Sequence, residues 1–123
     1  MNAVLWILQV LLALVFLASG LTKLAKPKEA LVGKLPVLAA YRAVTIKLVG
    51  LAEVLGAVGV VAPLALGVAP GLTPWAALGL AAIMVAAAVA HAEQRDYKPL
   101  AAHAVLLAMA VAVVYGRSAG VPV

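Results

Sequence analysis

The chain has 123 residues, of which 67% are hydrophobic and 11% are charged, and its mean hydropathy is +1.21. Soluble domains carry about 25% charged residues, and a single domain of this length is too small to bury so much apolar surface in a water-soluble core. The formal net charge is +5, but basic residues gather at the ends of apolar runs, a pattern of membrane proteins rather than of nucleic-acid-binding proteins. We therefore expect one transmembrane domain over residues 1–123, in contact with membrane lipid and without a nucleic-acid partner.

The chemistry open to this chain is narrowed by its lack of cysteine. Disulfide exchange, thiolate metal ligands, iron–sulfur clusters and thiol nucleophiles all require that residue. The chain also has no glycine-rich phosphate loop and no serine elbow. It therefore has no self-contained catalytic constellation and no intrinsic cofactor is expected, so that in an oxidoreductase it would act as one subunit.

Four apolar runs follow one another, each close to the roughly 20 residues that cross the hydrocarbon core of a bilayer. They do not alternate as the strands of a membrane barrel must, and helices satisfy their own backbone hydrogen bonds in lipid. The fold class is therefore all-α, a membrane-spanning four-helix bundle. The expected helices cover about residues 3–22, 44–66, 72–92 and 99–116.

The first predicted helix, residues 3–22, contains no charged residue. Its apolar run is longer than the core of a cleaved signal peptide and lacks a basic region before it, so we expect it to be retained. A long basic connection follows over residues 23–43, with breaks at Pro27 and Pro36. The middle of this connection can form a short helix lying in the membrane interface.

The second predicted helix contains Lys47 and Glu53. A charged side chain that faced lipid would be very costly, so we expect Glu53 to face the interior of the bundle. Small residues allow neighbouring helices to approach closely. The small residues expected at helix contacts are Gly50, Gly56, Ala57 and Gly59 in this helix and Gly79 in the third.

The third predicted helix closes on a histidine and the fourth opens with one. Because helices alternate in direction, their polar residues fall in the same half of the bundle, and we expect them to form one polar cluster. Its predicted members are Ser19, Thr22, Lys23, Lys47, Glu53, His91 and His103, whereas Gln9 lies in the opposite half.

Two interpretations of this cluster stay open. In the first, Glu53 pairs with a lysine or histidine and holds the helices in register, a structural role common among buried ion pairs. In the second, the cluster lines a pocket for a proton-coupled, quinone-like or other amphipathic ligand. One glutamate and two histidines on separate helices have no diagnostic metal-ligand spacing, so no metal site is predicted.

The distribution of Lys and Arg predicts the orientation. The first and third connections together carry many basic residues, whereas the opposite side has only Arg117. The positive-inside rule therefore places both connections in the cytoplasm and both termini outside. The residues on the basic side are Lys23, Lys26, Lys28, Lys34, Arg42, Arg95 and Lys98.

Three segments together resemble the DoxX-like family: FLASGLTKLAKP, GLAEVLGAVGVVAP and LTPWAALGLAAIMVAAAVAH. The resemblance covers about residues 10–105 in the order and spacing of that family, and it implies a four-helix protein of the bacterial inner membrane. The family pattern falls on Gly20, Lys23, Leu24, Gly50, Glu53, Gly56, Gly59, Pro63, Leu72, Thr73, Pro74, Gly79, Met84 and His91.

The resemblance also implies a function. The family takes its name from a small subunit associated with quinone-linked thiosulfate oxidation, and other members are partners in membrane oxidoreductase complexes. It implies an accessory or interaction subunit of a quinone-linked redox system, with a redox protein or a second copy as partner. Two alternatives are a quinone-reactive subunit that uses Lys23, Glu53 and His91 to handle protons, and a ligand-binding or proton-coupled transport protein that uses Glu53.

Overall fold

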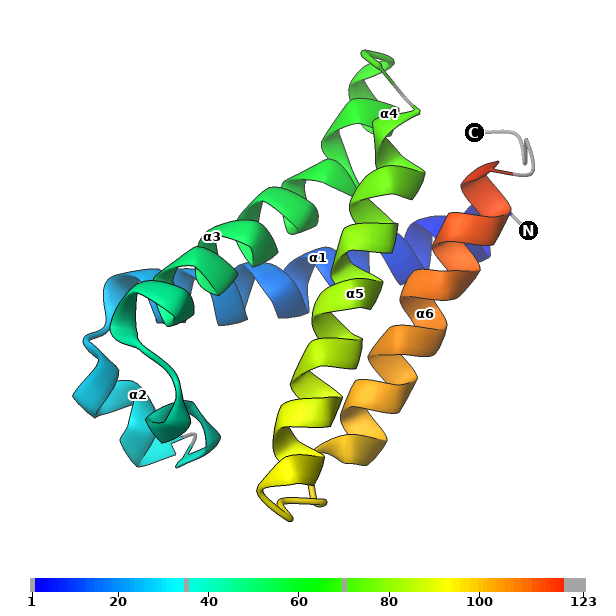
Figure 1. Ribbon diagram of the computed structural model, residues 1–123. Coiled ribbons are helices and arrows are strands. Elements are labelled where there is room, and N and C mark those ends of the chain that lie inside the picture. The colour runs from blue at the N-terminus through cyan, green and yellow to red at the C-terminus, as the bar shows by residue number, and fades with distance from the viewer. Residues whose placement is uncertain (1, 35, 70, 119–123) are drawn as a thin grey trace.

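The computed structural model in Figure 1 describes residues 2–34, 36–69 and 71–118, which are mainly helical with no strand among them. This confirms the all-α fold class. The elements are α1 Asn2–Ala25, α2 Lys28–Lys34, the short 3-10 helix η1 Pro36–Ala40, α3 Ala43–Gly59, α4 Ala62–Leu66, α5 Leu72–Glu93 and α6 Leu100–Ser118. The predicted short helix between the first two spans is present as α2, and η1 begins at Pro36.

Within the described residues, four helical segments are long and apolar enough to cross a membrane. Three of them are α1, α5 and α6, and the fourth is the Ala43–Leu66 segment that contains α3 and α4. Large apolar side chains such as Leu14, Leu55 and Val105 are exposed on these segments. The chain is therefore a multi-pass membrane protein whose apolar outer surface lies in lipid.

The four spans form two closely packed pairs, α1 with α3 and α5 with α6. Smaller contacts between α3 and α5 and between α1 and α6 join the pairs into a bundle. Figure 1 shows the pairs crossing, so that the α1–α3 connection and the α5–α6 connection lie well apart. The pairs thus diverge toward the end that carries these two connections.

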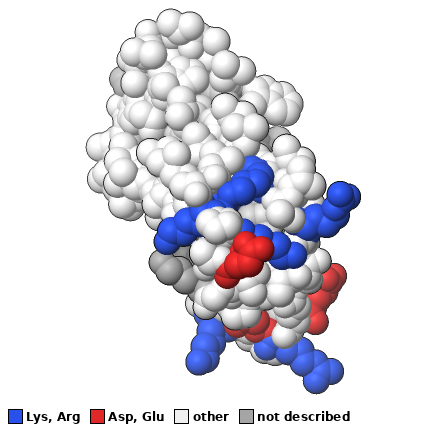
Figure 2. Space-filling view, turned by 90° about the vertical axis from the view of Figure 1, so that its left-hand side faces the viewer, with Lys and Arg blue, Asp and Glu red and all other residues white. Residues whose placement is uncertain are grey.

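Charged residues mark this end of the bundle, which we call the basic end and define as residues 23–34, 36–42 and 93–98. In the face shown in Figure 2, Lys, Arg, Asp and Glu side chains occupy one half of the molecule and the other half carries none. The charge distribution thus follows the prediction from the connections.

The apolar core occupies the middle of the bundle, where the two pairs cross. On α1 the buried side is a single stripe at helical spacing: Leu5, Gln9, Leu12, Phe16 and Gly20. The main cluster of buried apolar residues comes from all four spans and consists of Leu12, Phe16, Ala57, Val60, Ala77, Leu80, Ala81, Met84, Ala110 and Val113.

The sequence predicts one continuous helix over residues 44–66. In the structure, the second span is interrupted between α3 and α4. Pro63 has no backbone N–H, so it cannot bond the carbonyl of Gly59 one turn earlier. The Thr73 hydroxyl donates to that carbonyl instead, at 3.2 Å, and the Gln9 amide nitrogen donates to the carbonyl of Val60. Side chains from α5 and α1 therefore satisfy the backbone groups that the break leaves open.

Candidate functional site

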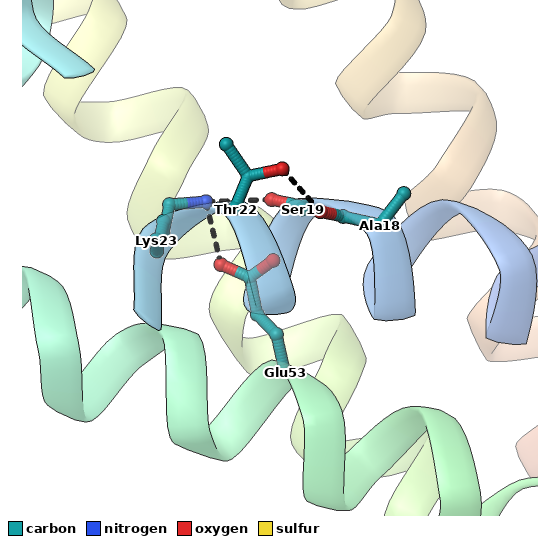
Figure 3. Close-up of polar contacts among 5 residues, drawn as sticks. All are labelled: Ala18, Ser19, Thr22, Lys23 and Glu53. Carbon is teal, nitrogen blue, oxygen red and sulfur yellow. Dashed lines mark hydrogen bonds and ion pairs between the residues drawn. The ribbon is translucent and has the colours of Figure 1, made fainter. Parts of the chain in front are cut away.

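The centre of the candidate site is an ion pair between the first two spans. Lys23 Nζ on α1 lies 2.8 Å from Glu53 Oε1 on α3 and also donates to Ser19 Oγ at 2.6 Å (Figure 3). Ser19 and Lys23 are four residues apart and so share one face of α1. The Glu53 side chain is only 3% exposed and that of Lys23 13%. The predicted inward-facing glutamate therefore has a basic partner.

Two glycines allow α1 and α3 to approach closely beside this pair. A Cβ added at Gly20 would lie 2.6 Å from the carbonyl oxygen of Gly50, and one added at Gly50 would lie 2.8 Å from Cβ of Lys23. Both distances are too short for any side chain. The small residues thus place the backbone of α3 where Glu53 can reach Lys23.

Two of the predicted cluster residues serve the helices instead of the site. Lys47 Nζ donates to the carbonyls of Lys23, Leu24 and Lys26, and so caps the C-terminal end of α1. The Thr22 hydroxyl donates at 2.7 Å to the Ala18 carbonyl of its own helix (Figure 3). Neither residue lies with the other five predicted members of the polar cluster.

The end of α5 places an acidic residue beside His91. Arg95 has a left-handed backbone with φ of 57°, and the amides of Arg95 and Asp96 bond back to the carbonyls of Ala92 and His91. This pair of bonds is a Schellman motif. It brings Asp96 Oδ2 to 3.0 Å from Nδ1 of His91, which is itself buried. We did not predict Asp96 as a site residue.

The second histidine lies against the first. His103 Nδ1 donates to the Pro99 carbonyl in the first turn of α6 at 2.6 Å. Its ring centroid is 5.0 Å from that of His91, with the ring planes inclined at 55°. The structure therefore brings the two predicted histidines together from adjacent helices.

These two groups line a common cavity of about 710 Å³ between the helix pairs. Lys23, Glu53 and Ser19 contribute from the α1–α3 pair, and His91, His103 and Asp96 contribute from α5, α6 and their connection. The remaining lining is mostly apolar and consists of Val15, Phe16, Pro36, Leu38, Tyr41, Thr45, Ile46, Val49, Ile83, Met84, Ala86, Ala87, Ala90, Lys98, Pro99 and Leu106. Phe16 and Met84 also belong to the buried core, so the cavity ends against it.

The residues predicted to pack helices separate into two groups. A Cβ at Gly56 would meet Leu80, a Cβ at Gly59 would meet Ala76, and Ala57 is buried in the core. Gly79 in α5 is exposed, and nothing lies within 4 Å of the position of an added Cβ. The structure therefore places Gly79 away from the helix contacts within this chain.

A second polar cluster occupies the opposite end of the bundle. Arg117 donates to Gln9 Oε1 at 2.7 Å and to Asn2 Oδ1 at 2.9 Å, and its guanidinium carbon lies 5.4 Å from the ring centroid of Trp6. The cluster fastens the end of α6 to α1. It explains why Gln9 can be fully buried away from the other polar residues.

The cavity has the size and composition of a site for an amphipathic small molecule. Ligand pockets measure about 300–1,000 Å³ and are mainly apolar, with a few polar groups that orient the ligand. The polar side chains of this lining include the ion pair and the two histidines. Among the residues that the structure describes, no group of three or more His, Cys, Asp and Glu side chains could hold a metal ion.

Comparison with known proteins identifies the family. The sequence model of the DoxX-like family matches residues 7–113. Comparisons with curated proteins and with solved structures gave no match. Because the family match covers most of the chain, the protein belongs to the DoxX-like family.

Proposed function

We propose that this member of the DoxX-like family is a small accessory subunit of a membrane redox system, and that it binds a quinone-like ligand between its two helix pairs. The observation that carries the proposal is the shared lining of one cavity by the Lys23–Glu53 pair and by His91 and His103. The apolar walls suit the ring and tail of such a ligand, and the polar groups suit its oxygen atoms.

The polar groups can exchange hydrogen bonds with a quinone head group. An ammonium carries three N–H donors, and Lys23 uses two of them on Ser19 and Glu53. The third can donate to a ligand carbonyl. The same ion pair also joins α1 to α3, so a structural role and a ligand-binding role are compatible in one pair of residues.

An accessory role follows from the residues that the chain provides. The sequence has no cysteine and no motif for a dinucleotide or flavin. The electrons would therefore be exchanged between the quinone couple and a redox protein partner. We expect that partner to dock where the cavity lies, toward the basic end of the bundle.

We infer the orientation of the protein in the membrane from the charges at the basic end. Basic residues concentrate in the α1–α3 and α5–α6 connections, which the positive-inside rule assigns to the cytoplasmic face of a bacterial inner membrane. Both termini then lie outside. Proton-coupled transport through Glu53 has less support, because the buried core fills the bundle beyond the cavity and Glu53 is already paired.

Ligand binding can be tested with the purified protein in lipid nanodiscs. We expect saturable binding of a decyl-substituted benzoquinone, weakened about tenfold in Glu53→Gln because the charge that orients Lys23 is lost. Thr22→Val, outside the cavity, should bind as the wild type does. If Glu53→Gln lowers the unfolding temperature but leaves the affinity unchanged, the pair is structural only.

The accessory role is tested separately by affinity capture of the full chain from its native membranes. The proposal expects a soluble or membrane-bound oxidoreductase to co-purify in a fixed ratio. A chain that purifies alone, as a stable monomer or homodimer, would contradict the accessory role but not the ligand site.

A further inference from the structure

The hydrogen bond already made by His103 determines what its ring can offer a ligand. Its Nδ1 atom lies 2.6 Å from the Pro99 carbonyl oxygen, which can only accept. The proton of a neutral ring must therefore sit on Nδ1. The remaining nitrogen, Nε2, is then a hydrogen-bond acceptor.

The ring of His91 is set in the same way by Asp96. Its Nδ1 atom lies 3.0 Å from Asp96 Oδ2, and an ionised carboxylate accepts only. In the neutral ring, Nε2 of His91 is again left as an acceptor. Neither Nε2 atom has a hydrogen-bond partner among the described residues, and both rings line the cavity.

The carboxylate of Glu53 adds a third acceptor. Its Oε1 atom is paired with Lys23 (Figure 3), whereas Oε2 has no hydrogen-bond partner among the residues described. Glu53 is 2% exposed and His91 6%, and both side chains line the cavity, where a bound molecule can reach their acceptor atoms. A ligand that donates hydrogen bonds would pair acceptors for which the protein supplies no donor.

The side chains of the cavity wall that can only donate are those of two lysines. Lys23 has one free N–H, and Lys98 lies exposed in the α5–α6 connection. The hydroxyls of Ser19, Tyr41 and Thr45 can donate or accept and so do not discriminate between ligands. A ligand with only carbonyl oxygens would leave the two imidazole acceptors unpaired.

From this inventory we propose that the cavity selects ligands whose polar end carries hydroxyl groups, and hence the hydroquinone form of a quinone couple over its oxidised form. The inference rests on the proposed ligand-binding function and names the form that binds. A site that hydrogen-bonds a hydroxyl rejects an analogue without one, because its own buried groups are then left unpaired.

The test uses two probes that exchange no electrons with a quinone couple: 4-decylphenol and its methyl ether, in which a methyl group replaces the hydroxyl hydrogen. Binding is measured to the full chain in nanodiscs at pH 8, where ordinary imidazoles are neutral, and corrected with empty nanodiscs. We expect the phenol to bind about tenfold or more tightly than the ether. Decylbenzoquinone, measured in parallel, should bind more weakly than the phenol.

The variants His91→Phe and His103→Phe keep a ring and remove the acceptors. Each should reduce the preference for the phenol while leaving the affinity for the ether within about threefold, which also shows that the cavity is intact. Tyr97→Phe, an exposed aromatic outside the cavity, is the matched control and should keep the full preference.

The outcomes separate the two proposals. Equal binding of phenol and ether, or tighter binding of decylbenzoquinone than of phenol, would overturn the selection for hydroxyl groups and leave the ligand site standing. An undiminished preference in both histidine variants would also overturn it. Failure of all three probes to bind saturably would overturn the ligand site itself and the inference with it.

Discussion

Lys23 Nζ on α1 lies 2.8 Å from Glu53 Oε1 on α3, beside the position where Gly20 and Gly50 bring the two backbones into contact. The close approach and the ion pair depend on each other. Without the glycines, Glu53 would not reach Lys23, and without Lys23 the packed helices would bury an uncompensated carboxylate. The same pair forms one wall of the cavity.

The ion pair should therefore contribute to stability in a way that depends on both partners. Glu53→Ala leaves the Lys23 ammonium without its counter-charge in a mostly buried place, and we expect a loss of about 3 kcal/mol in the free energy of unfolding. The double variant Lys23→Met with Glu53→Leu should recover most of this loss. Unfolding in detergent measures both, and a fully stable Glu53→Ala protein would refute the coupling.

Substitution of glycine by alanine should have opposite effects at two positions. In Gly20→Ala the new Cβ meets the Gly50 backbone, and separating the helices should cost about 2 kcal/mol. In Gly79→Ala the new Cβ meets nothing and gains up to about 1 kcal/mol of helix propensity. Thermal unfolding of the two variants distinguishes these signs, and equal destabilisation would show that Gly79 makes a contact beyond those within the chain.

The break in the second span should depend on a side chain from α5. Thr73→Val removes the hydroxyl that bonds the Gly59 carbonyl and should cost about 1 kcal/mol. Thr22→Val is the matched control, because its hydroxyl bonds only its own helix and should change stability by less than about 0.5 kcal/mol. The prediction fails if both variants unfold at the same temperature as the wild type.

The orientation can be tested with single cysteines, since the natural chain has none. In intact cells or spheroplasts, a membrane-impermeant maleimide should label Val68→Cys, between the second and third spans, and spare Gln94→Cys, after the third. Permeabilisation should expose Gln94→Cys. The reverse pattern would place the basic end outside and invert the proposed topology.

Apolar run lengths and residue types were sufficient to predict the four spans and the buried position of Glu53. They also predicted that polar residues from different helices would lie in the same half of the bundle. In the structure, Lys23, Ser19 and the two histidines line the cavity with Glu53. The sequence pattern was less precise about the side of each helix on which a polar side chain lies. Thr22 and Ser19 lie three residues apart on α1, yet only Ser19 lines the cavity.

The remaining features depend on contacts that no local pattern contains. Gln9 and Arg117 meet across 108 positions of sequence, and the role of Asp96 depends on a left-handed Arg95, a conformation more usual for glycine. Gly59 and Gly79 have the same residue type in similar apolar surroundings, but only Gly59 faces a neighbouring helix. Which of the two glycines faces a neighbouring helix depends on how the helix pairs cross.

The most direct test of the central claim is to fill the cavity and measure ligand binding. Ala87 lines the cavity, and Val89 on the same helix is half exposed outside it. In nanodiscs, Ala87→Trp should abolish the saturable binding of 4-decylphenol and decylbenzoquinone, whereas Val89→Trp should bind both as the wild type does. Unchanged binding by a folded Ala87→Trp protein would show that the cavity between the helix pairs is not the ligand site.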